Sequence, residues 1–529
     1  MPTDCISYQN SGYFTKLIVD YLEQKPELQP LYNLFPTFEN FAGQIAEKST
    51  NYNHSFRTVL TSVLQQQYQG IAISDKTQMN INALASENTF TITTGHQLNL
   101  FTGPLYFLYK IISTINLCDQ LKAKYPENNF VPIYWMATED HDFEEINYFT
   151  FKGKKFRWNR ESSGPVGHLS TDGLQDVAEL FALEIGTGDN AQYLKQLFRS
   201  AYLKHDNLAD ATRFLANELF AEYGLVIIDA NDHKLKEAFV PHIKSELLHQ
   251  RSHAAVTKSA DLLKEYNIQV TPREINLFYI GQNLRERIIF KDGVYHINNT
   301  AIKFSEEELV AEVDQRPEHF SPNVIMRPLY QEVILPNLCY IGGGGEIAYW
   351  LELKNYFNIS NVTFPMLLLR NSVLLATEKQ AKKAEKLTLS WQDLFSKQSE
   401  LVNRQVKKMS EFPIDLTPQK KVLHQQFAHL EKLAQQTDKS FIGAVKAQQA
   451  KQIKGLDNLE KRLLKAQKRK HAEQLQRITE LQNELFPYNS LQERQANYSE
   501  FYLEYGDKLI PRLISELNPL EHNFNIIVL

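Results

Sequence analysis

A loop with one histidine and two amide side chains follows the first strongly β-forming stretch of the chain. Residues 90–94 are rich in threonine, and after a glycine the sequence continues His96-Gln97-Leu-Asn99. A helix is expected to begin near Pro104, because proline is tolerated in a first helical turn. Ligands of parallel sheets bind outside the carboxyl ends of the strands, where a histidine can donate, accept or transfer a proton. A plain strand-to-helix turn with a surface histidine is the alternative.

An acidic cluster follows the second β-forming stretch, residues 131–137. It reads Glu139-Asp140-His141-Asp142-Phe-Glu-Glu, and carboxylates this close repel one another unless a positive charge lies among them. Helix capping accounts well for the last two glutamates. It accounts less well for Asp140, His141 and Asp142, which stand at the expected end of the strand. We therefore interpret Asp140, His141 and Asp142 as functional residues that could bind a metal, orient an amine or carry out acid–base chemistry.

Four consecutive glycines, Gly342, Gly343, Gly344 and Gly345, precede an expected helix at residues 347–357. Their amides can face a phosphate or carboxylate at the helix N-terminus, or the run can be a sharp turn. It lacks the spacing of a Walker loop and of a dinucleotide fingerprint. Upstream, Arg327 can clamp a carboxylate or form an ordinary salt bridge. The other residues assigned to substrate binding are Gly95, Gln97, Asn99, Asn323, Glu332, Tyr349 and Trp350.

The elements around these residues predict an α/β fold. Strand, helix and strand follow one another over residues 90–137, a βαβ unit that implies a parallel sheet with a right-handed crossover. The sheet is expected to resume at 223–230, which contains Asp229. Two stretches of different character interrupt it, at about 148–215 and 254–320, and the second has hairpin signals. Further strands are expected at 324–326, 338–341 and 364–369.

The composition shifts at about residue 372 to lysine, glutamine, glutamate and leucine with helical periodicity. Leucine and isoleucine seams at 456–463 and 475–485 predict a coiled coil. One continuous helix over 376–411 would span roughly 50 Å, so an antiparallel projection is expected. Lys407-Lys-Met-Ser410 and the basic run at 461–470 are interpreted as solvated helix faces. The expected domains are a helical lead-in at 1–85, a core at 86–375, a coiled-coil domain at 376–485, and a tail at 486–529 that packs back on the core.

The bulk composition excludes several classes of protein. A net charge of −5 and a pI near 6.3 give no general attraction to nucleic acid or to an anionic membrane. No apolar run has transmembrane length, and the polar first ten residues do not resemble a signal peptide. The three cysteines form no CxxC pair, which is typical of a reducing cytoplasm and argues against a thiolate zinc site. We expect a cytoplasmic protein without a metal site.

Taken together, these motifs resemble one family over nearly the whole chain. The matching residues are Thr94-Gly95-His96-Gln97 with 100–106, then 135–145, Arg327-Pro, 342–350 and Leu491-Gln-Glu-Arg494. They are similar to the cysteine ligases of bacillithiol biosynthesis, the BshC family. The resemblance implies a Rossmann-like core with two connective insertions, a coiled-coil domain that forms a homodimer, and addition of cysteine to glucosaminyl-malate.

The resemblance also shapes the expected chemistry. His96 would stabilise or protonate developing charge, Asp140 and His141 would handle the amine, and Arg327 with the glycine amides would hold carboxylates. In related class I ligases a Gly-His turn carries histidines that contact a nucleotide phosphate. Here there is one such histidine and no lysine-rich signature loop, so the activating cofactor stays open, with ATP or another nucleotide as the candidate. A nucleotidyl transferase on the same sheet and a non-catalytic coiled-coil scaffold are the alternatives.

Overall fold

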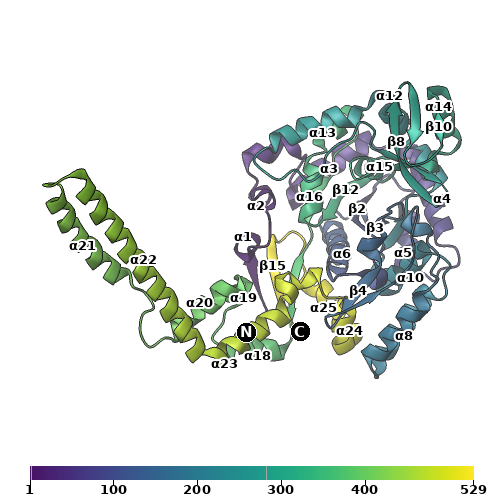
Figure 1. Cartoon of the computed structure of the whole chain (residues 1–529). Helices are drawn as coiled ribbons and strands as arrows, with labels where there is room; N and C mark the ends of the chain where they lie inside the picture. The colour runs from purple at the N-terminus through teal and green to yellow at the C-terminus, as the bar shows by residue number, and fades with distance from the viewer. Residues whose placement is uncertain (2, 282) are drawn as a thin grey trace.

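A five-stranded parallel sheet forms the centre of the molecule (Figure 1). The computed structural model describes residues 1, 3–281 and 283–529. The strand order is β13-β12-β2-β3-β6, and all neighbouring pairs are parallel. This confirms the predicted α/β fold with a parallel sheet. The strands are β2 (Thr89–His96), β3 (Asn129–Met136), β6 (Val226–Asp229), β12 (Asn337–Gly342) and β13 (Met366–Leu369).

The sheet is buried because its strands are covered by helices on both faces, as parallel sheets usually are. Between β2 and β3 runs α6 (Tyr106–Lys124), which buries most of its length against the sheet. In the register His96 lies opposite Met136, and Met136 lies opposite Asp229. The carboxyl ends of β2, β3 and β6 are therefore level. This confirms that the loops after these strands open on one edge of the sheet.

The first insertion leaves the sheet after β3 and returns at β6. It contains a hairpin and three helices, held around an aromatic cluster that includes Phe149, Phe181 and Phe198. Phe101, from the loop after β2, packs into the same cluster. This insertion is therefore fixed to the loop that carries His96. Its elements are β4 (Tyr148–Phe151), β5 (Lys154–Arg157), α8 (Leu174–Ile185), α9 (Asp189–Tyr202) and α10 (Leu208–Phe220).

The second insertion contains an antiparallel sheet in the order β10-β9-β8-β7-β11. The expected strand at 324–326 is wrong: it is a turn before α15 (Arg327–Ile334). The physical reason is Asn323, whose Oδ1 accepts a hydrogen bond from the amide of Ile325 at 2.9 Å and folds the chain over. The strands are β7 (Leu277–Gly281), β8 (Leu284–Lys291), β9 (Val294–Ile297), β10 (Lys303–Phe304) and β11 (Phe320–Pro322).

The two chain termini meet in a second, three-stranded sheet of order β1-β15-β14 (Figure 1). It joins β1 (Asp4–Ser7), β14 (Ser372–Ala376) and β15 (Asn523–Val528). Residues 372–376, expected to begin a helical region, are therefore a strand. Their partner in the parallel pair is the far end of the chain, which local periodicity does not reveal. Apart from β1, the lead-in is helical and includes α2 (Lys16–Leu22) and α3 (Phe38–Asn51).

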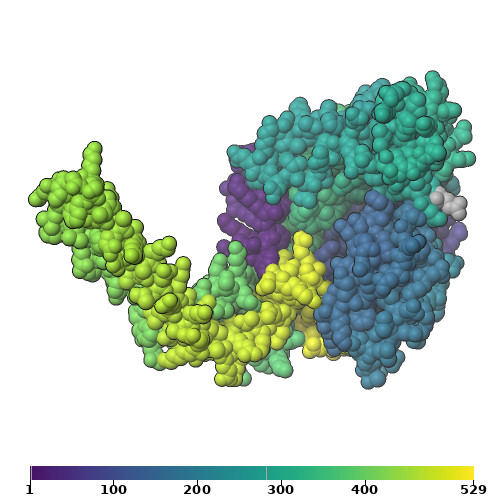
Figure 2. All heavy atoms as spheres, viewed as in Figure 1, coloured from purple at the N-terminus to yellow at the C-terminus, as the bar shows by residue number. Residues whose placement is uncertain are grey.

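The helical region after β14 divides into a part packed on the core and a projecting hairpin. The expected continuous helix over 376–411 is wrong, because Thr388 has a φ of 56° and Ser390 caps a new helix. Figures 1 and 2 show α21 (Thr417–Ala434) and α22 (Lys439–Lys470) extending away from the rest of the molecule. The packed helices are α18 (Glu378–Lys386), α19 (Trp391–Phe395), α20 (Gln398–Met409) and α23 (Ala472–Leu485).

The expected helix at 347–357 is two helices, α16 (Gly344–Leu351) and α17 (Lys354–Ser360). Between them Glu352 is fully buried, and its carboxylate accepts the backbone amide of Gln269 at 2.7 Å. The break therefore ties the second insertion to the core beside the glycine run.

Candidate functional site

A cavity of about 720 Å³ lies at the carboxyl ends of the central strands. Its walls come from the loops after β2 and β3, the start of α16, and the second insertion through Arg273, Phe278 and Arg285. The C-terminal tail contributes Arg494. The structure brings eleven of the residues assigned from sequence into this lining: Gly95, His96, Gln97, Asp140, His141, Asn323, Arg327, Gly343, Gly344, Gly345 and Tyr349.

Five residues assigned to the site from sequence do not line the cavity: Asn99, Asp142, Glu332, Gly342 and Trp350. Asn99 donates to the Glu145 carbonyl at 3.2 Å, and Asp142 occupies the N-cap position of α7 (Phe143–Ile146). Gly342 ends β12, and its carbonyl accepts the amide of Arg370 at 2.9 Å. Trp350 is buried behind Tyr340, with 4.6 Å between the ring centroids.

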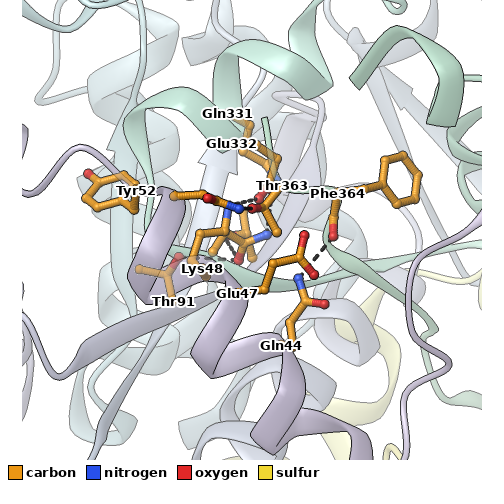
Figure 3. Close-up of polar contacts among 12 residues, drawn as sticks. Gln44, Glu47, Lys48, Tyr52, Thr91, Gln331, Glu332, Thr363 and Phe364 are labelled. Carbon is orange, nitrogen blue, oxygen red and sulfur yellow. Dashed lines mark hydrogen bonds and ion pairs between the residues drawn. The ribbon is translucent and has the colours of Figure 1, made fainter. Parts of the chain in front are cut away.

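The fifth of these, Glu332, belongs to a buried polar network between α3 and α15 (Figure 3). Its carboxylate accepts from Lys48 Nζ at 2.8 Å, Asn337 Nδ2 at 2.6 Å and Gln331 Nε2 at 2.9 Å. Lys48 and Glu332 are each 2% exposed. Glu332 is thus saturated with protein donors and does not contact a ligand in the cavity.

His96 is buried and neutral. Burial, with the positive charges of Lys110 and Arg370, holds the pKa of its imidazole well below the usual value. Its Nε2 has no hydrogen-bond partner within the protein, and the residue lines the cavity. A neutral ring can accept a proton or exchange hydrogen bonds with a ligand, but it is not an imidazolium. The expectation that His96 protonates developing charge therefore conflicts with its surroundings.

Asp140 is held in its ionised form. Although burial raises its pKa, hydrogen bonds from His141 and Gln97 and the nearby charge of Arg285 bring the pKa well below the usual value. Oδ2 accepts from Gln97 Nε2 at 2.9 Å, and Oδ1 accepts from the His141 backbone amide at 2.7 Å. A carboxylate stabilised in this way is a weak base and a strong acceptor for an ammonium group.

His141 is oriented by Arg285, a residue of the second insertion that sequence reasoning missed. The two side chains meet at 2.7 Å between Arg285 Nη1 and His141 Nδ1. Arg285 Cζ also lies 4.0 Å from the ring centroid of Phe278. Its Nη2 and Nε donate to Ser321 Oγ at 3.3 and 3.4 Å. His141 Nδ1 also lies 3.7 Å from Asp140 Oδ1. A guanidinium has no acceptor, so the contact with Arg285 favours Nδ1 as acceptor and leaves Nε2 to donate toward the cavity. The catalytic role of His141 stays a prediction.

The glycine run is shaped by packing and by Glu346. The amide of Gly343 already donates to Glu346 Oε2 at 2.9 Å, and the same carboxylate pairs with Lys110 Nζ at 2.5 Å. A Cβ on Gly344 would lie 3.3 Å from Ile18 of α2, whereas a Cβ on Gly345 would meet no atom within 4 Å. The Gly343 amide is therefore satisfied internally, and the binding of an anion by the other amides of the run stays a prediction.

Two arginines line the cavity, the buried Arg370 and the partly buried Arg327, and each has one nitrogen without a hydrogen-bond partner, Arg370 Nε and Arg327 Nη2. Arg370 forms a two-pronged ion pair with Glu493 at 2.7 and 3.0 Å. Among the described residues, no carboxylate lies within ion-pair distance of Arg327. It is instead surrounded by the rings of Trp135, Tyr340 and Trp350 at 5.5 to 5.9 Å.

The cations Lys110, Arg370 and Arg494 were also missed from the sequence. Lys110 had a visible signal, since it stands inside the apolar run Leu-Tyr-Lys-Ile-Ile, where a charge needs a partner. Arg494 follows Glu493 in the tail, and this segment reaches the site because Gln492 pairs its side-chain amide with the backbone of Leu375 in β14.

In the described part of the chain, no group of three or more histidine, cysteine, aspartate or glutamate side chains is arranged to hold a metal ion. Within the same residues, no helix combines the length and apolar character needed to cross a membrane.

Models of one protein family match nearly the full length of this chain. The model of the bacillithiol biosynthesis BshC N-terminal Rossmann-like domain matches residues 1–371, and that of the BshC C-terminal coiled-coil domain matches 373–529. A relative from Flavobacterium johnsoniae, named "Putative cysteine ligase BshC", is 68% identical over 100% of both chains. A relative with the same name from Cytophaga hutchinsonii is 38% identical over 98% of each chain. Another from Bacillus cytotoxicus is 28% identical over 94% of this chain and 95% of the relative. The chain therefore belongs to the BshC family of bacillithiol biosynthesis.

Proposed function

We propose that this protein joins the carboxyl group of cysteine to the amine of glucosaminyl-malate. The new bond is an amide, and the oxygen of the cysteine carboxyl leaves with the group that activates it. Three features support the proposal: membership of the family, a large charged cavity at the strand ends, and separate cationic and anionic regions within it.

The observation that carries the proposal is Arg327. Its guanidinium is partly buried in the cavity wall, Nη2 has no hydrogen-bond partner, and no carboxylate lies within ion-pair distance among the described residues, so an anion bound there would be stabilised. A malate group offers two carboxylates, and Arg327 Nη2 is a charged donor without a protein acceptor. We therefore place the malate end of the acceptor substrate at Arg327.

The amine end of that substrate is assigned to Asp140 and His141. The ionised Asp140 accepts an ammonium group, and His141 donates from Nε2 to an oxygen of the sugar or of the cysteine carboxyl. The amine must lose a proton before it attacks. The neutral His96, with its unpartnered Nε2, is the group proposed to take it and pass it on to the departing activating group, because its lowered pKa makes it a base that does not retain the proton.

ATP or another nucleotide is the proposed activator of the carboxyl group. The donor set fits a phosphate, because Lys110, Arg370 and Arg494 all line the cavity and Arg370 Nε is unpartnered. When bound, the nucleotide would supply a good leaving group for the cysteine carboxyl. The protein residues then bind, orient and remove the proton from the amine.

Purified protein incubated with cysteine, glucosaminyl-malate and ATP tests the proposal by mass spectrometry of the thiol product. The product should contain both substrates joined with the loss of one water. Nucleotide turnover that needs a metal but not cysteine would instead indicate a nucleotidyl transferase. A scaffold would leave an apolar, empty cleft, whereas this cavity is lined by charged groups.

Self-association through the projecting hairpin is the second part of the proposal. The small apolar cluster of Phe427, Ala434 and Val445 joins α21 to α22. Large apolar side chains remain exposed along the same two helices: Val422, Leu430, Leu433, Phe441 and Leu459 are 42 to 54% exposed. A second copy of the hairpin would cover them, which supports a homodimer.

A further inference from the structure

The buried pair behind the cavity is connected to Arg327 by a single amide side chain. Gln331 Oε1 accepts from Arg327 Nη1 at 3.0 Å, and Gln331 Nε2 donates to Glu332 Oε1 at 2.9 Å. We propose that Lys48, Glu332 and Gln331 are positioning residues that hold Arg327 in the orientation that binds the carboxylate end of the substrate. This inference rests on the proposed function for the identity of that substrate.

The direction of the Gln331 amide follows from the chemistry of its two neighbours. An amide has one acceptor end and one donor end, a carboxylate only accepts, and a guanidinium only donates. With Glu332 ionised, the Gln331 nitrogen must face Glu332 and its oxygen must face Arg327. A flipped amide would set two acceptors against each other at Glu332 and two donors against each other at Arg327.

Lys48 is the counter-charge of Glu332. Burial raises the pKa of Glu332 above its ordinary value, and the ion pair with Lys48 Nζ at 2.8 Å, with the hydrogen bonds from Asn337 and Gln331, opposes that rise and stabilises the carboxylate. Lys48 belongs to α3 in the helical lead-in, and Figure 3 shows it reaching Glu332 from that helix. The lead-in, to which the sequence assigned no chemistry, thus takes part in shaping the site.

Arg327 has few other directional constraints. Its neighbours Trp135, Tyr340 and Trp350 present ring faces, which attract the cation without fixing its rotation. Tyr349 is a second polar neighbour. The contact with Gln331 ties Nη1 to α15 and leaves Nη2 free to meet a carboxylate. Loss of this contact should misplace the guanidinium, and a displacement of about 1 Å at a binding group can reduce activity by about 10²-fold.

The first experiment measures binding of L-malate by calorimetry or NMR titration to Arg327→Met, Gln331→Met and the double variant. Gln331→Met keeps the side-chain length and should raise the dissociation constant about tenfold. The double variant should bind malate no more weakly than Arg327→Met does. If Gln331 acts only by orienting Arg327, its replacement has no further effect once Arg327 is gone. Asn116→Met is the matched control: it removes a buried amide that donates to the carbonyls of Ile514 and Leu517, outside the cavity lining.

The second experiment separates positioning from bulk stability. Lys48→Met/Glu332→Gln removes both charges but keeps an acceptor for Gln331, so malate binding should weaken less than in a variant that also loses the acceptor. Lys48→Met/Glu332→Met also removes that acceptor, and should weaken binding as Gln331→Met does. Equal affinities for these two variants, or additive effects of Arg327→Met and Gln331→Met, would overturn the inference.

Failure of the proposed function gives a different result. If glucosaminyl-malate yields no thiol product while the variants still change malate binding in the expected order, the substrate is wrong and the positioning role stands. If product forms and Arg327→Met weakens malate binding but Gln331→Met only lowers the melting temperature, the function stands and the positioning role fails.

Discussion

Arg285 and His141 meet at 2.7 Å between Nη1 and Nδ1, although they come from the second insertion and from the loop after β3. The guanidinium can only donate, so this contact favours the tautomer of His141 in which Nδ1 accepts and Nε2 donates. The insertion thus does more than enclose the cavity, because it contacts a histidine that the sequence alone allowed to be either a base or a donor.

His141→Gln should retain most of the activity, because the glutamine amide can donate from nearly the position of Nε2. His141→Leu should lose only about tenfold, the effect of one hydrogen bond. Loss of a general base would instead reduce the rate by about 10² to 10⁴-fold. Steady-state rates of thiol formation check this, with Arg285→Met as the companion variant. Equal, large losses in His141→Gln and His141→Leu would show that His141 is the base after all.

Asp140→Asn should weaken binding of the amine-bearing substrate while the fold is maintained. The variant removes the negative charge that accepts the ammonium group, but an asparagine still fits between Gln97 and the backbone. We expect the KM for glucosaminyl-malate to rise about tenfold or more, in line with the loss of a charged hydrogen bond of roughly 1.5–3 kcal/mol. The KM for cysteine and the melting temperature serve as controls. An unchanged KM with a lowered melting temperature would identify Asp140 as a structural loop residue.

Arg327→Met and Arg370→Met should separate binding from stability. Arg370 forms a buried ion pair with Glu493, so its loss leaves an uncompensated buried carboxylate and should destabilise the protein by about 3–5 kcal/mol. Arg327 has no such partner among the described residues, and its replacement should leave the melting temperature nearly unchanged while malate binding is lost. Thermal melting and malate titration on both variants test this. A large drop in melting temperature for Arg327→Met would contradict the assignment of Arg327 as a free anion site.

The parts of the site that sequence could predict are those held by local pattern. Strand-to-loop transitions at Gly95 and Ala137 are visible in a single sequence, and the βαβ rule then places their ends together. Arg285 and Arg494 were missed because they reach the cavity only through the second insertion and through the pairing of the C-terminal tail with β14. Arg370 directly follows β13, a strand that was expected, and was missed although it stands at a strand end. Long-range pairing also explains the missed strand β14. Its partner β15 lies at the other end of the helical region.

Glu332 illustrates a different limit. Its position between Arg327 and the glycine run suggested a role in the site, and it lies on α15, the helix that begins with Arg327. Only the structure shows that its side chain points to Lys48 of the lead-in. No periodicity in the sequence encodes that pairing.

The stability of the protein should fall as the pH rises from about 4.5 to 7, because Glu352 loses its proton in the folded state over this range. Burial raises the pKa of this carboxyl to about 7 from its ordinary value of 4.5, against the opposing hydrogen bonds from the amides of Gln269 and Val270. The folded state therefore holds a proton that the unfolded state has released between these values, so this group disfavours folding increasingly from about pH 4.5 to 7. Glu352→Gln removes the effect. The melting temperature of the variant relative to wild type should be higher at pH 8 than at pH 5, and a constant difference would contradict the assignment.

The projecting hairpin should carry self-association through its exposed apolar side chains. Leu433 and Phe441, each 48% exposed, flank the turn between α21 and α22, and Val422 and Leu459 are further exposed positions on the two helices. Replacing all four by glutamate introduces charges that a dimer interface would have to desolvate, while the packed helices and the core are untouched. Sedimentation should show a dimer for the wild type and a monomer for this variant.

The matched control for the hairpin is Leu183→Glu. Leu183 is 82% exposed on α8, in the first insertion, so the same kind of substitution should leave the sedimentation unchanged. Deletion of residues 376–485 is a poorer test, because Ile478, Leu481 and Leu485 of α23 belong to the main core cluster and their loss would unfold it. If the fourfold glutamate variant remains a dimer with an unchanged melting temperature, the subunits associate through another surface and the hairpin has a different role.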